Sequence, residues 1–176
     1  MKRILVFGSS NSKKLINKQL AIYAARKLKN AELVIIDLND FNLPLYSPDL
    51  QEEQGMPTEV VRFNDLLLSA EGIILSMAEY NGCYTTVFKN IFDWLSRIDK
   101  NVWKGKPMLL MGTSPDKRGA KSVIQIAKDA FPYYGGNVIT DFSLPQFNQN
   151  FQAGKLINEV FERELNAKIE VFQEAL

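Results

Sequence analysis

The chain has 176 residues, 46% of them hydrophobic and 11% aromatic, which is enough to bury one sizeable core, so we expect a single domain over residues 1–176. Its 21 Lys and Arg nearly balance its 20 Asp and Glu, which excludes a strong overall field for attracting nucleic acid or an anionic membrane. With no histidine and one cysteine, Cys83, the composition excludes an internal disulfide, a Cys/His zinc cluster and a His-assisted nucleophile.

Five short apolar runs with strand character follow one another: RILVFG (3–8), ELVIIDL (32–38), GIILSM (72–77), PMLLMGT (107–113) and NVITDFSL (137–144). Continuous runs of this kind are typical of strands covered on both faces. Helical stripes lie between and after them, formed by Ile16, Leu20, Tyr23, Ala24 and Leu28, by Phe88, Ile91, Phe92, Leu95 and Ile98, and by Ile157, Phe161, Leu165 and Phe172. This alternation predicts a parallel sheet with helices on both faces.

Two other features concern location and the longest irregular segment. The start, MKRILVFGSS, is too short for a secretory core, and no apolar run approaches the ~20 residues that span a bilayer. We therefore expect a cytoplasmic protein that binds neither membrane nor nucleic acid. Residues 39–57 are rich in aliphatic and aromatic side chains, so they are expected to pack as a loop beside the sheet.

In a doubly wound sheet, ligands bind beyond the carboxyl ends of the strands, where the strand order reverses. The loop after the first strand, GSSNSKKLIN (8–17), offers hydroxyls, an amide and backbone N–H groups at a helix start. Lys13 and Lys14 oppose the helix dipole there, at roughly 0.3 to 1 kcal/mol each, unless an anion binds beside them. The pattern favours a phosphate site, and an ordinary helix cap with two solvated lysines is the alternative.

The loops after the third and fourth apolar runs are also unusual. AEYNG (78–82) combines an aromatic face with a glycine and exposed peptide groups, which suit a flat polar ring, although a plain strand-to-helix turn is the alternative. GTSPDKRGAKS (112–122) combines hydroxyls and glycines with Lys117, Arg118 and Lys121 near a helix start, and a solvated basic turn is its alternative. Together the three loops favour a flat molecule that carries a phosphate.

These motifs identify a resemblance. The chain resembles the NADPH-dependent FMN reductase family of the flavodoxin-like superfamily, chiefly in AEYNG (78–82) and KNIFDW (89–94), and also in LPLYSPDL (43–50), KGKPMLLMGTSP (104–115) and FSLPQF (142–147). The resemblance implies an α/β flavodoxin-like three-layer sandwich with a five-stranded parallel sheet of order 2-1-3-4-5.

The resemblance also implies which residues hold FMN. The phosphate would lie against the first loop, and the isoalloxazine against the loops after the third and fourth runs. The expected cofactor-binding residues are Ser10, Ser12, Asn17, Ala78, Glu79, Tyr80, Asn81, Gly82, Thr113, Ser114 and Gly119. No catalytic side chain and no metal site are expected, because the flavin carries the chemistry.

The implied activity is an NAD(P)H-dependent oxidoreductase that passes electrons from NADPH or NADH through FMN to a quinone, a free flavin or a similar small acceptor. The expected assembly is a homodimer or a dimer of dimers, formed partly by the helix that begins near Tyr84, with Tyr84 and Phe88 toward the second copy.

The alternative is a flavodoxin-like module with weak or lost FMN binding that acts through a partner. It rests on departures from the family pattern: Leu15 stands where a second phosphate-loop serine is usual, Ala78 replaces a proline, and Cys83 replaces a small hydroxyl residue. Ser9 replaces a glycine and Thr85 a proline in the same pattern. A one-electron flavodoxin carrier is a further option, but such domains are commonly acidic. A phosphoacceptor receiver domain is discarded, since GSS and MAE stand where it needs carboxylates.

Overall fold

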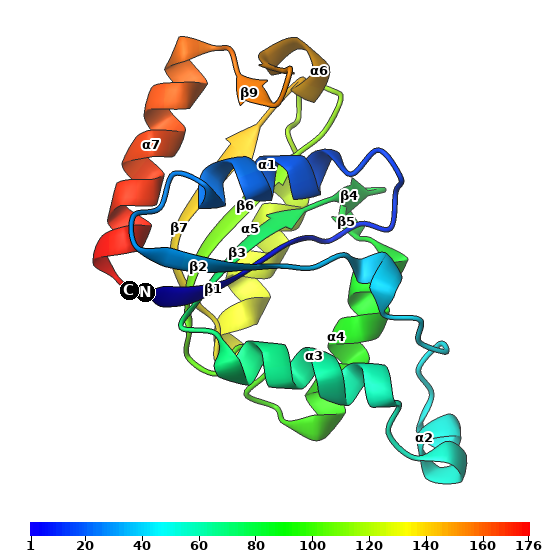
Figure 1. Ribbon diagram of the computed structural model, residues 1–176. Coiled ribbons are helices and arrows are strands. Elements are labelled where there is room, and N and C mark those ends of the chain that lie inside the picture. The colour runs from blue at the N-terminus through cyan, green and yellow to red at the C-terminus, as the bar shows by residue number, and fades with distance from the viewer.

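The five apolar runs form one parallel sheet in the computed structural model, which describes residues 1–176 (Figure 1). Its strands are β1 (Lys2–Gly8), β2 (Ala31–Ile35), β3 (Gly72–Met77), β6 (Pro107–Thr113) and β7 (Asn137–Leu144), in the order β2-β1-β3-β6-β7. Ile4 of β1 is paired with Leu33 of β2 on one side and with Gly72 of β3 on the other. The predicted order 2-1-3-4-5 is therefore confirmed, and the order reverses between β1 and β3.

Helices cover both faces of this sheet (Figure 1). Because side chains alternate along a strand, Leu5 and Phe7 of β1 belong to one buried cluster and Ile4 and Val6 to the other. The first cluster lies under α3 (Thr58–Ser69), α4 (Thr86–Ile98) and α5 (Lys121–Ala130). The second lies under α1 (Ile16–Ala25) and α7 (Glu159–Glu174). This is the expected three-layer arrangement.

Short elements fill the connections. They are η1 (Leu38–Asp40), α2 (Pro48–Gln54), η2 (Phe131–Tyr134) and α6 (Phe147–Asn150), with two small hairpins, β4 (Glu79–Tyr80) with β5 (Cys83–Tyr84) and β8 (Phe151–Gln152) with β9 (Lys155–Leu156). The segment 39–57 is thus partly helical, and α2 has no buried residue and stands away from the sheet in Figure 1. No helix combines the length and the apolar composition that crossing a membrane requires.

The aromatic residues near the start of α4 lie differently from our expectation. Phe88 is 2% exposed and packs among Phe92, Trp103 and Phe131 inside this chain, so the idea that it faces a second copy is wrong. Tyr84 is mostly buried beside the same rings, stacked on Phe131. Phe88 belongs to the buried stripe of α4 and Tyr84 packs against the same cluster, so both rings serve the core of this chain.

Candidate functional site

A cavity of about 230 Å³ lies where β1, β3 and β6 end. Its wall is built by the loop after β1, by the segment that leads from β3 into β4, by the end of β6 and by α6. The residues that line it are Ser10, Ser12, Lys14, Ile16, Asn17, Ala78, Glu79, Tyr80, Thr113, Ser114, Pro115 and Asn148. The cavity therefore sits at the reversal point of the strand order, where this topology leaves a crevice.

Asn17 fixes the floor of this cavity. Its Oδ1 accepts hydrogen bonds from the Ser76 hydroxyl at 2.7 Å and from the Thr113 N–H at 3.0 Å, and its Nδ2 donates to the Thr113 carbonyl at 3.1 Å. The amide is buried, so each of these bonds matches a group that would otherwise be unpaired. Asn17 thus joins the start of α1 to the ends of β3 and β6.

The loop after β1 is held by small polar side chains. Ser9 is fully buried, and its hydroxyl accepts from the Ala78 N–H at 2.8 Å. The Ser10 hydroxyl accepts from the Ser12 N–H at 3.0 Å and lies 3.2 Å from the Tyr80 hydroxyl. Tyr80 is 45% exposed, so its ring forms an open wall of the cavity.

The start of α1 carries unused donors beside these hydroxyls. The N–H groups of Ile16, Asn17 and Lys18 in its first turn donate to no other group of the chain. Leu15 provides no side-chain cap, and the first turn holds no acidic residue. An anion satisfies such orphan groups and is attracted by the helix dipole, and Lys14 in the cavity wall adds a positive charge. These residues therefore fit the phosphate of FMN.

Leu15 does not lie where the family pattern suggests a phosphate-binding serine. It adopts the left-handed conformation, with φ of 52°, and it does not line the cavity, whereas its neighbours Lys14 and Ile16 do. We therefore expect a serine at position 15 to add little to a phosphate site in this cavity. The departure at Leu15 is therefore a poor reason to expect lost phosphate binding.

The turn AEYNG forms a tight hairpin between β4 and β5, in which Glu79 pairs with Tyr84 and Tyr80 with Cys83. Asn81 and Gly82, at φ of 53° and 77°, make its two-residue turn. This is the geometry of a type I′ turn, for which Asn-Gly is the preferred pair. The hairpin projects the Tyr80 ring beside the cavity mouth.

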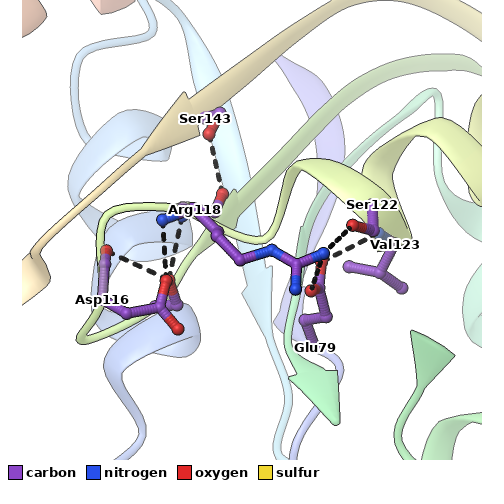
Figure 2. A network of polar contacts seen from close by, with 8 residues as sticks. Glu79, Asp116, Arg118, Ser122, Val123 and Ser143 are labelled. Atoms are coloured by element: carbon purple, nitrogen blue, oxygen red, sulfur yellow. Dashed lines mark hydrogen bonds and ion pairs between the residues drawn. The ribbon is translucent and has the colours of Figure 1, made fainter. Parts of the chain in front are cut away.

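The loop after β6 is closed on itself by polar contacts (Figure 2). The Ser114 hydroxyl donates to Asp116 Oδ1 at 2.9 Å and accepts from the Gly119 N–H at 2.9 Å. The Arg118 N–H donates to the same Asp116 oxygen at 2.7 Å. These bonds, that from Arg118 foremost, hold the pKa of Asp116 below its usual value. The Ser143 hydroxyl ties the loop to β7 through the Gly119 carbonyl.

Glu79 links that loop to the hairpin. Its Oε2 accepts from the Val123 N–H in the first turn of α5 at 3.0 Å, and its Oε1 lies 3.8 Å from Arg118 Nη2 (Figure 2). Arg118 also donates to the Ser122 hydroxyl at 2.7 Å. The sequence suggests that α5 begins with a second basic helix start. In the structure, a carboxylate from the same chain already caps this start.

Most of the predicted cofactor-binding residues come together. Ser10, Ser12, Asn17, Ala78, Glu79, Tyr80, Thr113 and Ser114 line the cavity, while Asn81, Gly82 and Gly119 lie outside its lining. Ile16, Pro115 and Asn148 line it and were missed. Asn148 follows the end of β7 at the same sheet edge, so the rule that located the other loops could have found it.

A larger hollow of about 390 Å³ is lined by Asn11, by the first turns of α4, and by Leu38, Asn39, Phe41, Asn42, Leu43 and Leu45. None of its lining residues is charged, and it contains no uncapped helix start, since Thr85 caps α4. The smaller cavity is therefore the better match for a phosphate.

Comparison with known proteins agrees with this geometry. Residues 2–149 match the family model of the NADPH-dependent FMN reductases. A quinone reductase of Escherichia coli (strain K12) is 30% identical over 125 residues, which are 65% of this chain and 66% of that protein. A 2-hydroxy-1,4-benzoquinone reductase of a Burkholderia species is 34% identical over 113 residues, 64% of this chain and 60% of that protein. The alignments thus span less than two thirds of each relative.

Solved structures match over nearly the whole chain. FerB, a flavoenzyme NAD(P)H:(acceptor) oxidoreductase from Paracoccus denitrificans, superposes with a TM-score of 0.79 at 27% identity, over 99% of this chain and 97% of that one. An azoreductase from Bacillus anthracis gives a TM-score of 0.64 at 15% identity, over 99% of this chain and 100% of that one, which is a likeness of fold.

Proposed function

Because the chain belongs to the NADPH-dependent FMN reductase family, we propose that it binds FMN in the cavity at the ends of β1, β3 and β6. It uses NADPH or NADH to reduce a quinone, a free flavin or a similar small acceptor. The observation that carries this proposal is the first turn of α1, where the free N–H groups of Ile16 and Asn17 stand beside serine hydroxyls in one cavity wall. The quinone reductases among its relatives support the choice of acceptor.

The chain's contribution to the reaction is binding and orientation. The N–H groups of α1, the hydroxyls of Ser10 and Ser12, and Lys14 would hold the phosphate. Tyr80 and the peptide groups around Ala78 and Thr113 would line the ring. Bound FMN supplies the redox chemistry, which is acceptance of hydride from reduced nicotinamide and its delivery to the acceptor. No side chain has to act as an acid or a base.

Binding of the nicotinamide nucleotide would draw on the loop after β6. Lys117 and Arg118 are exposed there, and the Arg118 side chain is 66% accessible. Their charges would attract the nucleotide's phosphates, an attraction that salt screens over about 8 Å at physiological ionic strength. We therefore place the entry of the reduced nucleotide on this side of the hairpin.

Two adjacent lysines allow a matched test. Lys14 lines the cavity and Lys13 does not. Lys14→Gln is expected to weaken FMN about two- to fivefold at low salt, the range for an exposed charge worth up to ~1 kcal/mol. It should leave riboflavin unchanged, because riboflavin has no phosphate. Lys13→Gln should weaken FMN less.

The measurement is quenching of flavin fluorescence in titrations with FMN and riboflavin, followed by NAD(P)H oxidation with benzoquinone as acceptor. A wild-type protein that binds neither flavin would overturn the proposed function. An equal effect of Lys14→Gln on both flavins would contradict a phosphate site at the start of α1.

We also propose a homodimer that acts in the cytoplasm. The support lies in residues 39–54, where Leu45 is 74% exposed and α2 buries no residue against its own chain (Figure 1). Covering this segment with a second copy would remove apolar surface from water. A monomer by light scattering at micromolar concentration with saturating FMN would contradict this.

A further inference from the structure

Glu79 has a largely buried side chain. The side chain is 9% exposed, it lies in the cavity wall, and one oxygen accepts from the Val123 N–H at 3.0 Å. Its other oxygen is 3.8 Å from the largely exposed Arg118, too far for a hydrogen bond. The closest partner of the carboxylate is therefore the first turn of α5, whose dipole stabilises a negative charge.

The first turn of α5 depends on this contact. Ala120 precedes the helix in the left-handed conformation and supplies no side-chain cap, and the first turn contains no acidic residue. The carboxylate comes instead from a hairpin 44 residues earlier in the chain. The same carboxylate thus bridges two walls of the cavity, the hairpin β4–β5 and the loop that leads into α5 (Figure 2).

We propose that Glu79 is a positioning residue, which acts as a built-in anion at the start of α5 and thereby sets the spacing between the two walls that hold the flavin ring. Its side chain acts on α5, and only its backbone belongs to the ring site. This inference rests on the proposed function for its ligand, whereas the capping contact can be tested without any flavin.

Two substitutions at Glu79 distinguish the hydrogen bond that caps α5 from the negative charge of the carboxylate. In Glu79→Ala the Val123 N–H loses its acceptor, so riboflavin affinity should fall by up to roughly tenfold, because binding must then restore a wall spacing that one charge-assisted hydrogen bond had fixed beforehand. Glu79→Gln keeps an oxygen acceptor at the same place but removes the negative charge, so it should recover only part of that affinity. Riboflavin is the probe because it lacks a phosphate, so changes in its affinity report on the ring walls.

Chemical rescue distinguishes a lost anion from a damaged fold. Acetate can occupy the space that Glu79→Ala vacates at the α5 start, so it should restore part of the riboflavin affinity of that variant. Chloride at the same ionic strength should not, and acetate should not change the wild type.

Ser47→Ala is the matched control, since Ser47 caps α2 through its side chain and does not line the cavity. It should lower the unfolding temperature as Glu79→Ala does, while leaving riboflavin affinity unchanged. Equal loss of riboflavin affinity in both variants, or no loss in Glu79→Ala, overturns the proposal.

Amide hydrogen exchange in flavin-free protein provides a readout that does not depend on the proposed function. The Val123 amide should exchange faster in Glu79→Ala than in wild type, and acetate should slow it again. If wild type binds no flavin, the proposed function fails and exchange alone decides this inference. Unchanged Val123 exchange in Glu79→Ala would refute it.

Discussion

Gly82 holds the tip of the hairpin beside the cavity in a conformation that other residues resist. Its φ is 77°, and a Cβ atom added there would meet nothing within 4 Å. The cost of Gly82→Ala is therefore conformational, about 1–2 kcal/mol of the free energy of unfolding. We expect that loss in urea unfolding, together with weaker flavin binding, because the strained turn shifts the Tyr80 ring.

The second hairpin supplies the control. Ala153 and Gly154 form an equivalent turn between β8 and β9, with φ of 48° and 76°, and a Cβ atom at Gly154 also meets nothing. Gly154→Ala should cost a similar free energy of unfolding and leave flavin affinity as it is. If both variants lose flavin affinity alike, the hairpin β4–β5 has no special part in the site.

The same hairpin shows where reading single residues falls short. Asn81 and Gly82 are the strongest short-range signal for a two-residue hairpin. Its strands contain only two residues each, too few for an alternating pattern, so the segment reads as a turn into the next helix. The residue types predict a ring-binding turn, but its geometry depends on pairing that such short strands do not reveal.

At the scale of elements, Thr85 connects α4 to the loop after β1. Its buried hydroxyl accepts from the Phe88 N–H, which caps the helix, and donates to the Ser9 carbonyl. Thr85→Ala leaves both groups unpaired in the interior, which should cost about 2 kcal/mol or more. Thermal unfolding should show the loss, and FMN affinity should fall because the first loop is released.

Ser47→Ala is the comparison for this prediction. Ser47 caps α2, a helix with no buried residue, so its loss should cost about 1 kcal/mol or less and leave FMN affinity unchanged. Similar losses of stability and affinity in both variants would show that Thr85 acts only as a helix cap.

Strands that are buried on both faces could be predicted from the sequence, whereas contacts between loops could not. The runs 72–77 and 107–113 match β3 and β6 residue for residue, because their hydrophobicity follows directly from burial. By contrast, the Glu79 contact with Val123 spans 44 residues and depends on how two loops meet. Ile157 follows the helical period but lies outside α7, where it is 52% exposed.

For the whole molecule, stability should fall in acid because paired carboxylates must be protonated. Burial opposes ionisation of Asp37 and Glu162, yet hydrogen bonds from Lys18 and Lys27 bring both pKa values below their ordinary 3.8 and 4.5. A pKa that is lower in the folded state gives stability that is present above the unfolded value and lost below it. The unfolding temperature should decrease as the pH falls below about 4.5.

At alkaline pH the dependence is reversed, and stability falls as the pH rises. Burial foremost raises the pKa of Tyr84 from 10.0 to about 12, so stability is complete below pH 10 and lost between pH 10 and 12. The Tyr84 hydroxyl is buried without a partner, so Tyr84→Phe should not lower the unfolding temperature at neutral pH and should weaken its alkaline decline. The pKa values of Tyr23 and Lys27 are also raised, so these two groups account for the alkaline loss of stability that remains in Tyr84→Phe. An unchanged alkaline decline in Tyr84→Phe would contradict this.

The hydrogen bonds of Asn17 also determine at which stage of folding the cavity can form. They join Asn17 to Ser76 and Thr113, which are 59 and 96 residues away along the chain. Contacts over such separations require closure of long loops and form late and slowly. A nascent chain that ends at β3 has α1 and the first loop, but it lacks the β6 wall. At the proposed site, flavin can therefore bind only after β6 has joined the sheet, so a chain that ends before β6 cannot take it up.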